Sequence, residues 1–399
     1  MREATLILTL GAALSSPAVS DEPRRITIQS GQGFPDAVVV PESLSLVHTT
    51  QILALDGSGA IVHEATERQA AAILERLDQT LAAYHTDTAR LVKVNLYAID
   101  HEALGALRAA LLNRLDGRPT PAISAVVTRL PLPQARVALD AVATRAVEAR
   151  SEDSLEIGPN RPLTARTGSV AAVLPRGRRV YVSGQADPAP SLSEATRKTL
   201  ESLDATLKHL GLNRRQVVQA KSFLTPMSSV EEAAQQFVSF FGKDAIPPLV
   251  FVEWRMNTPI EIELVVAAGA SPDGPPIEYL STPELKPSPV FSRIARINRG
   301  DLIYTSDVAG SEGTSASDQV EAIFAKLKSV MAETGSDLRH LAKATYYVAD
   351  DEASRALNDL RPRHYDPARP PAASKATVAE VGIKGRTVTL DMIAIKPPR

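Results

Sequence analysis

The chain of 399 residues contains no cysteine, few aromatic residues and no cluster of basic side chains. Without cysteine it has no disulfide, no thiolate nucleophile and no cysteine-based zinc or iron–sulfur site. Aromatic residues make up 4% of the chain, and the formal net charge is −2. The first value argues against base-stacking platforms, and the absence of a basic tract argues against a nucleic-acid groove or membrane-surface patch. We therefore expect neither a nucleic-acid partner nor a membrane partner.

Motifs for metals, phosphates and serine nucleophiles are also missing. None of the seven histidines pairs with another at the spacing of helical metal ligands, and no HExxH sequence occurs. The glycines at positions 31, 33, 310 and 313 lack the Lys-Ser/Thr that follows a phosphate loop. We expect no metal and no other cofactor, and we interpret His48 as a structural histidine in a strand.

No stretch is long and apolar enough to be a transmembrane helix, but the N-terminus carries a shorter apolar run. Residues 4–14 are largely apolar, and the small residues Ala18 and Ser20 precede Asp21. This pattern is typical of a secretory signal peptide, whose apolar core is too short to span a bilayer. We expect a signal peptide at residues 1–20 and export to the periplasm or the medium, with a cytoplasmic location as the alternative.

What the chain does contain is one structural unit repeated three times. In the middle unit a strand at residues 180–185 runs into a Ser-Gly break, and Ser191 and Glu194 have capping-box spacing at the start of a helix. A second strand, a second helix and a last strand at residues 260–267 complete the unit. The second strands of the three units align residue by residue, at 92–97, 218–223 and 342–347.

The chain length allows each unit a small core of its own. We place the three units at residues 33–150, 160–270 and 288–398. The stretch 271–289 between the second and third units is rich in proline, so we expect an extended, stiff linker. In the first unit, Thr66 and Gln69 have the spacing of a capping box at the start of the long helix.

The order of these motifs resembles the RidA/YjgF family, also called endoribonuclease L-PSP-like proteins or reactive-intermediate deaminases. Residues 181–185 read Tyr-Val-Ser-Gly-Gln, like the family's V-S-G-Q strand, and residues 261–263 read Glu-Ile-Glu, like its last strand. The resemblance covers most of residues 33–398 in three tandem copies. It implies an α+β fold in which each RidA-like domain is a mixed sheet covered by two helices. Family members form homotrimers, so three linked copies imply an intrachain pseudo-trimer and a monomeric chain.

The resemblance also implies a chemistry and a set of site residues. The family hydrolyses enamines or imines derived from amino acids, in clefts between neighbouring subunits. An arginine in a P-A-R-S turn holds the substrate carboxylate, and the first glutamate of E-I-E acts on water. On this basis Glu261 is the catalytic candidate. The substrate-binding candidates are Ser183 and Gly184 in the V-S-G-Q strand, Asn358 at the family's cleft asparagine, and Arg108 at that position in the first copy.

No copy carries the full set of family residues. Apolar residues occupy all three arginine positions: Ile123, Leu249 and Ala373. The glutamate is replaced by Ala138 in the first copy and by Thr389 in the third. The Ser-Gly pair is matched by Thr49-Thr50 in the first copy and by Ser306-Asp307 in the third. Because the arginine is absent throughout, we expect hydrolysis of amino-acid-derived imines to be very weak.

Three functions stay open at this point. The first is a protein that binds a small metabolite between its repeats, with the deaminase chemistry weakened or lost. The second is an active enamine/imine hydrolase with an altered substrate, in which Glu261 activates water. The third is a protein-interaction scaffold whose clefts are vestigial.

Each candidate residue also has a purely structural interpretation. Glu261 is then a solvated carboxylate at a strand edge, and Ser183-Gly184 is a bulge or tight turn. Asn358 and Arg108 are then exposed helix residues. If Glu261 is functional, we expect Leu249→Arg to restore the missing arginine contact with the substrate carboxylate in the copy that retains Glu261.

Overall fold

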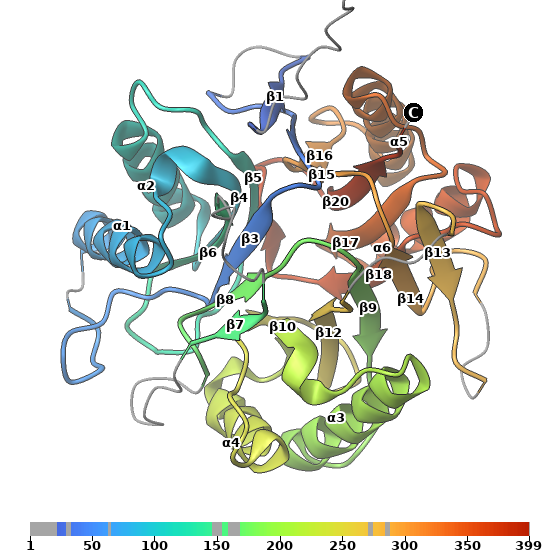
Figure 1. The fold of residues 1–399 in the computed structure, drawn as a ribbon. Coiled ribbons are helices and arrows are strands. Elements are labelled where there is room, and N and C mark those ends of the chain that lie inside the picture. The colour runs from blue at the N-terminus through green and yellow to red at the C-terminus, as the bar shows by residue number, and fades with distance from the viewer. Residues whose placement is uncertain are drawn as a thin grey trace, which may run out of the picture.

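The computed structural model describes residues 22–28, 33–62, 65–145, 154–158, 168–269, 274–283 and 288–398. The predicted signal peptide at residues 1–20 lies outside these ranges. Figure 1 shows three repeats around a common centre, with their strands inside and their helices outside. Within the described ranges, no helix is both long and apolar enough to cross a membrane.

The three repeats share one order of elements, and the third has two additional short strands, β16 and β19. The first has β1 (Arg24–Ile26), β2 (Ala37–Val40), β3 (Ser45–Thr49), α1 (Thr66–Ala83), β4 (Leu91–Ala98), α2 (His101–Arg114), β5 (Ala122–Val127) and β6 (Val137–Arg145). The second has β7 (Glu156–Ile157), β8 (Ala171–Leu174), β9 (Arg179–Gln185), α3 (Leu192–His209), β10 (Val217–Leu224), α4 (Val230–Phe241), β11 (Leu249–Glu253) and β12 (Ile260–Ala267). The third has β13 (Ile277–Leu280), β14 (Ile294–Ile297), β15 (Asp301–Thr305), β16 (Val308–Ala309), α5 (Ala316–Thr334), β17 (Leu341–Val348), α6 (Asp351–Leu360), β18 (Ala372–Thr377), β19 (Glu380–Val381) and β20 (Val388–Lys396).

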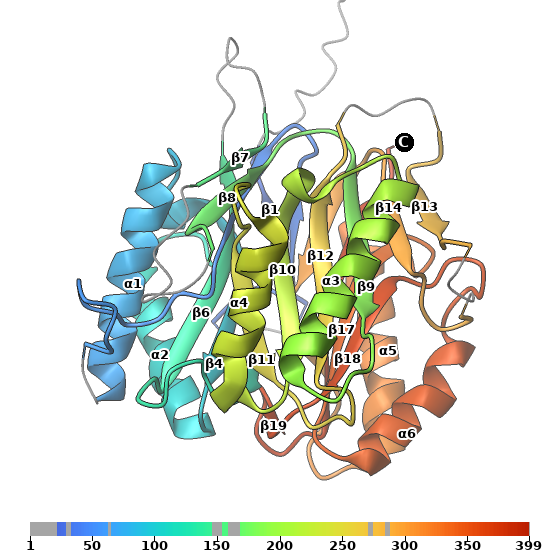
Figure 2. The same ribbon diagram turned by 90° about the horizontal axis from the view of Figure 1, so that it is seen from below.

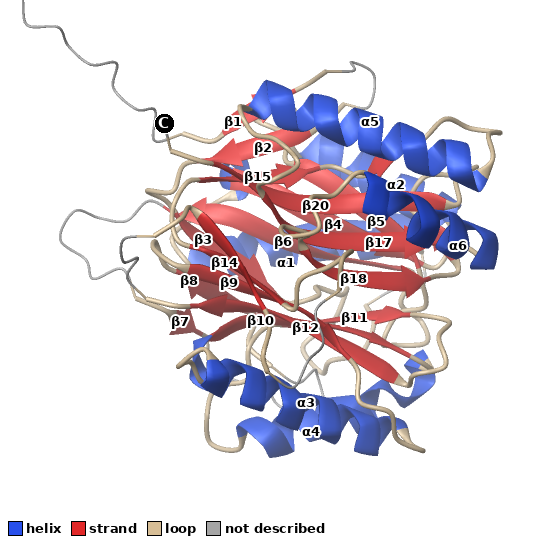
Figure 3. Cartoon of the chain, turned by 90° about the vertical axis from the view of Figure 1, so that its right-hand side faces the viewer, coloured by secondary structure: helices blue, strands red, loops and turns tan. Residues whose placement is uncertain are grey.

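Each repeat forms a mixed sheet with two helices on its outer face (Figures 2 and 3). The pairs β4–β5, β10–β11 and β17–β18 are parallel, and the neighbouring pairs are antiparallel. This confirms the predicted α+β fold of three mixed sheets with helices. The predicted strand at residues 260–267 coincides with β12.

The sheets are linked by an exchange of strands between repeats. The second strand of the second repeat, β8, pairs with β3 of the first repeat, and β14 of the third repeat pairs with β9 of the second. The ring closes because β2, near the N-terminus, pairs with β15 of the third repeat, with Val39 opposite Ile303. Each sheet is therefore completed by a strand that belongs to the next repeat.

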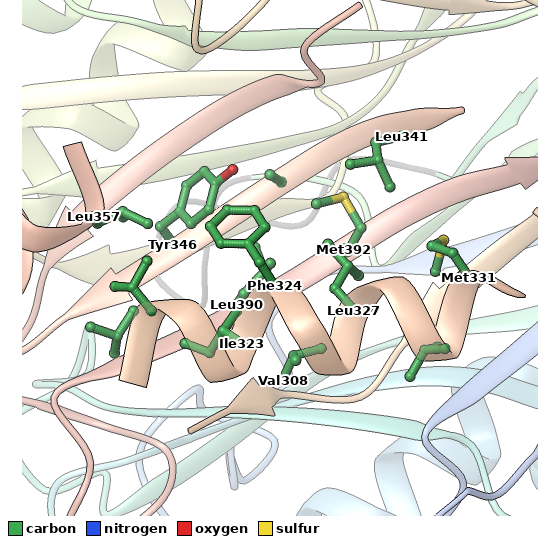
Figure 4. Close-up of a cluster of buried hydrophobic side chains, with 14 of the residues drawn as sticks. Val308, Ile323, Phe324, Leu327, Met331, Leu341, Tyr346, Leu357, Leu390 and Met392 are labelled. Carbon is green, nitrogen blue, oxygen red and sulfur yellow. The ribbon is translucent and has the colours of Figure 1, made fainter. Parts of the chain in front are cut away.

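Three apolar cores lie between the sheets and their helices, and a fourth joins the repeats. In the third repeat, Ile323, Phe324 and Leu327 of α5 pack against Leu390 and Met392 of β20 (Figure 4). The fourth core combines the inward faces of strands from all three sheets. Burial of apolar area there holds the repeats together, because each sheet has apolar side chains on both faces.

The centre of the ring also encloses a small polar cavity of about 50 Å³. Lysines and carboxylates from different repeats pair across it: Lys93 contacts Asp391 at 2.9 Å and Lys343 contacts Glu263 at 2.7 Å. His48 lines the same cavity, and burial lowers its pKa to about 3. The histidine is therefore neutral and faces the axis of the ring.

Two local expectations differ from the structure. The N-cap of α1 is Ala65 and makes no side-chain hydrogen bond, so the predicted capping box of Thr66 and Gln69 does not form. The Gln69 side chain is buried and instead donates to the Gln134 carbonyl at 2.9 Å and accepts from the Arg136 amide at 2.8 Å. In the proline-rich stretch, β13 is extended as expected, but it also pairs with β14.

The strand exchange predicts that a mutation near the N-terminus destabilises the third repeat. Val39 is buried in the core of that repeat, so Val39→Ala should lower the free energy of unfolding by about 2 kcal/mol. Hydrogen exchange measured by mass spectrometry should then be faster in β15, which pairs with β2. The increase should be larger than any in β3, which follows β2 in the sequence. The matched control Val173→Ala, in β8, should instead raise exchange in β3. Faster exchange in β3 on mutation of Val39 would contradict the pairing.

Candidate functional site

The ring creates three junctions, which we name by the repeats that meet there. At each junction, the end of an inner strand of one repeat lies against the edge strand of the next. At the 1/2 junction, the Gln51 amide donates to the Leu249 carbonyl at 3.0 Å, and at the 3/1 junction the Asp307 amide donates to the Ile123 carbonyl at 3.0 Å. At the 2/3 junction, the end of β9 lies beside β18, and the Ser183 amide donates to the carbonyl of Arg293, which directly precedes β14, at 2.9 Å.

The strand register shows which residues are equivalent in the three repeats. The pairs Gln185–Ile262, Ile52–Leu139 and Val308–Leu390 occupy the same place. Counting back one position, Gly184 corresponds to Gln51 and to Asp307. The match of Ser183-Gly184 to Thr49-Thr50 is therefore wrong by one residue. The sequence alone does not show which residues of neighbouring strands lie opposite each other. The correct match is Thr50-Gln51.

The 2/3 junction holds Glu261 directly against Gly184. Ser183 and Gly184 form a bulge in β9, as the structural interpretation predicted, and any side chain at position 184 would overlap the Glu261 carboxylate. The sheet places β12 between β10 and β9, so Glu261 does not lie at a strand edge. Its Oε1 is buried and has no hydrogen-bond partner in the described structure.

Burial gives Glu261 an unusual acidity. Loss of water around the carboxylate raises its pKa to about 7, against an ordinary value of 4.5. The Ser374 hydroxyl offsets part of this shift, Glu263 adds to it, and more distant cations reduce it. A carboxyl group with a pKa near 7 can accept or donate a proton at neutral pH.

The third repeat brings Asn358 and a lysine to the same junction. Lys375 of β18 donates to the Ser354 hydroxyl at 2.8 Å and to the Asn358 side-chain oxygen at 3.1 Å, both from α6. Burial lowers the pKa of Lys375, Arg361 lowers it further, and Glu261 raises it. The structure thus brings together four of the predicted site residues, and Lys375 interacts with two of them.

Two cations near Glu261 were missed by the sequence comparison. Lys375 lies two positions beyond Ala373 in β18, and alternate residues of a strand share a face. That spacing was a usable signal, because a cation at 375 lies on the same face as the family's arginine position. Arg293 also lies within electrostatic range of Glu261, stacks over the Phe291 ring at 4.8 Å, and has a buried Nε without a described partner.

The other two arginine positions are filled by core residues. Ile123 and Leu249 are buried in the cores of their own repeats. Leu249 lies at the 1/2 junction, whereas Glu261 lies against Ser374 of the third repeat. The expectation that Leu249→Arg completes the Glu261 site is therefore wrong, because an arginine there meets the first repeat.

At the 1/2 junction the polar side chains are already hydrogen-bonded, and they line a small cavity of about 30 Å³. Gln51 donates to the Phe251 carbonyl at 3.0 Å and accepts from the Phe251 amide at 3.3 Å, which uses both polar atoms of its side chain. Thr50 donates to the Leu249 carbonyl at 2.8 Å. Ala138 replaces the glutamate, so this junction has no acid at the position of Glu261, although Glu231 of α4 lines its cavity.

The 3/1 junction carries a carboxylate in the place of Gly184. Asp307 Oδ2 accepts a hydrogen bond from the Ala125 amide at 2.7 Å. Arg108 lies here, at a different junction from Glu261, and donates to the Gly382 carbonyl at 3.4 Å. It is partly buried over the Phe34 ring and is therefore not the exposed helix residue of the structural interpretation.

The acidity of Glu261 predicts how stability depends on pH. Its folded-state pKa of about 7 exceeds its ordinary value of 4.5, so the folded state holds the proton more tightly and stability falls as pH rises between these values. Urea unfolding should show that Glu261→Gln is more stable than the wild type at pH 8, by about 1–3 kcal/mol, and similar at pH 4.5. The control Glu75→Gln, at an exposed carboxylate, should change neither value. Parallel pH profiles for the wild type and Glu261→Gln would contradict the burial of this charge.

Comparisons with known proteins agree with this architecture. The family model described as endoribonuclease L-PSP matches residues 35–145, 160–268 and 283–396. No match was found among curated proteins.

Similar solved structures are single-repeat proteins in length. They include a YjgF family member, NMB1025, from Neisseria meningitidis (24% identity, 31% of this chain, 97% of that chain, TM-score 0.24). The Rid family protein YyfB from Yersinia pestis has 20% identity over 31% of this chain and 99% of its own, with a TM-score of 0.27. Yeast Mmf1 has 19% identity over 32% of this chain and 98% of its own, with a TM-score of 0.23.

The family model matches more than half of the chain, and its three matches coincide with the three sheet-and-helix repeats. The chain therefore belongs to the endoribonuclease L-PSP family, the YjgF/RidA proteins, and carries three copies of the family domain in tandem.

Proposed function

We propose that this protein binds a small, negatively charged metabolite at the 2/3 junction and retains weak enamine/imine hydrolysis there. The observation that carries the proposal is the half-buried Glu261 side chain against Gly184, whose buried Oε1 has no hydrogen-bond partner in the described structure. The Ser183 hydroxyl is also buried there without a described partner. Buried polar groups in this state favour a polar ligand, because leaving them unpaired costs free energy.

The residues of this junction support a proton-transfer chemistry. With a pKa of about 7, the Glu261 carboxylate can take a proton from water as the water adds to the C=N carbon of an imine. The protonated carboxyl can then give this proton to the nitrogen, which yields a carbinolamine. Transfer of the carbinolamine hydroxyl proton to the same nitrogen through the carboxylate breaks the C–N bond, so that ammonia leaves and a carbonyl forms. Lys375 and Arg293 favour a substrate with an anionic group near this point.

The expected activity is weak for a physical reason. The Lys375 ammonium group is a point charge, and it already donates hydrogen bonds to Ser354 and Asn358. An arginine, by contrast, holds a carboxylate with two parallel hydrogen bonds. The substrate is therefore oriented less firmly toward the water. A protein-interaction scaffold is a weaker alternative. It is supported only by the 1/2 junction, where the polar side chains already hydrogen-bond to each other's repeats.

We propose further that the chain works as a monomer. The three repeats exchange strands within one chain, and linking them gives each a high effective concentration for the others. Sedimentation velocity over a range of concentrations should therefore give the mass of one chain. A stable assembly of three chains would contradict this proposal.

Substitutions at the 2/3 junction test the proposed chemistry. Glu261→Gln should lower kcat for imine hydrolysis at least about 100-fold, because it removes the proton acceptor. Ala373→Arg should raise kcat/KM for carboxylate-bearing imines about tenfold, because it adds a charge-assisted contact.

The matched control is Leu249→Arg, which places the same side chain at the 1/2 junction. It should leave the activity unchanged, since that junction has Ala138 in the place of Glu261. Equal gains from both arginine variants, or full activity in Glu261→Gln, would show that the reaction does not occur at the 2/3 junction.

A further inference from the structure

We propose that the polar cavity on the axis of the ring binds one small monovalent inorganic anion of the size of chloride, held by Arg179 and by hydrogen-bond donors from all three repeats. The cavity is separate from the three junctions, so the proposal does not depend on the activity proposed for Glu261. It rests on a buried cation that no described carboxylate balances and on buried donors that no described acceptor uses.

The inner strands carry a polar side chain at one level of every repeat. His48 of β3, Tyr181 of β9 and Tyr304 of β15 each lie opposite an apolar residue that lines the cavity. Residues that lie opposite each other on neighbouring strands share a face of the sheet, so all three side chains are on the inner face. His48 and Tyr304 line the cavity themselves.

Arg179 is a buried cation at a position where the other two repeats have leucine. It lies two residues before Tyr181 and therefore on the same face of β9. The equivalent residues of the first and third repeats are Leu46 and Leu302, and both are buried in the core that joins the repeats. Arg179 is buried as well, with 2% of its surface exposed. A buried charge is destabilising unless an opposite charge lies close to it.

In the described part of the chain, no carboxylate forms an ion pair with Arg179. Its Nη2 donates to the Leu44 carbonyl at 2.9 Å, and its Nε is buried without a described partner. The other cations at the cavity each face a carboxylate: Lys93 faces Asp391, Lys343 faces Glu263, and Lys221 faces Asp140. Since His48 is neutral, Arg179 leaves one positive charge without a counterpart.

The donors near Arg179 are also unused. Arg179 interacts electrostatically with His48, Tyr181 and Tyr304, which places the four side chains close together. Within the described ranges, both tyrosine hydroxyls and both ring nitrogens of His48 are buried and make no hydrogen bond of normal geometry. The two hydroxyls lie near each other, but one hydrogen bond between them would still leave a donor free.

A small anion satisfies this arrangement. A guanidinium N–H, a tyrosine hydroxyl and the N–H of a neutral imidazole are all donors, and hydrogen bonds to an ionised acceptor are the stronger kind. A cavity of about 50 Å³ has room for an ion of the size of chloride and is too small for an organic anion such as gluconate. Because the donors come from all three repeats, the bound ion bridges the ring.

The test is urea unfolding of the full chain in sodium chloride and in sodium gluconate at equal ionic strength. Chloride should raise the unfolding midpoint until the site is saturated, because an ion that binds only the folded state stabilises it, and gluconate should not. Arg179→Leu, which introduces the residue of the other two repeats, should abolish the difference between the salts. Arg197→Leu removes an exposed arginine of α3 and should keep that difference.

Two further measurements locate the ion. Tyr304→Phe should raise the chloride concentration of half effect about tenfold, because it removes one hydrogen bond to a charged group. In crystals soaked in sodium bromide, anomalous scattering should place one bromide between Arg179 and Tyr304. Absence of bromide there, equal midpoints in the two salts, or an unchanged chloride effect in Arg179→Leu would each overturn the proposal and show that the cavity holds only water.

Discussion

The rest of the structure depends on the exchange of strands between repeats. Each sheet is completed by the first two strands of the next repeat, and the ring closes when β2 pairs with β15. A repeat without its borrowed strand exposes an unpaired edge and part of an apolar core. The repeats therefore cannot separate without losing backbone hydrogen bonds, and their junctions are held in a fixed geometry.

A closed ring of linked repeats permits junctions that differ from one another. In a trimer of identical chains every substitution occurs at all three junctions, whereas here each junction has its own residues. The pairs Gly184–Glu261 and Asp307–Thr389 place the acid on different strands, and the pair Gln51–Ala138 of the 1/2 junction has no acid. At the 2/3 junction the glycine is required, because a side chain at position 184 would overlap the Glu261 carboxylate. The chain thus keeps the family's geometry while its three clefts have diverged.

Much of the fold was predictable from the sequence, and the composition of the sites was not. Apolar periodicity predicted β12, and the Ser-Gly pair predicted the bulge that brings Gly184 against Glu261. Which repeats meet at a junction depends on strand exchange, for which no local sequence pattern exists. For this reason Arg108 was grouped with Glu261, and Leu249 was taken as the position for a restored clamp. Lys375 was missed because the comparison tested only the family's own position, Ala373.

The polar residues along the axis link the junctions to the stability of the ring. Lys343 pairs with Glu263 in the cavity, and both groups influence the pKa of Glu261, which shares a face of β12 with Glu263. An unpaired buried charge is destabilising, so replacing one member of these ion pairs along the axis destabilises the ring unless its partner is replaced as well. The acidity of the site is therefore set partly by a second repeat.

The central claim is that two of the three junctions retain a buried carboxyl group with an acidity suited to neutral pH. Its most direct test is a ¹³C NMR titration of the side-chain carboxyl groups, with Glu261→Gln and Asp307→Asn used to assign the signals. The account predicts that Glu261 and Asp307 each titrate with a pKa of about 7. Titration of both groups at the ordinary values near 4 would contradict it.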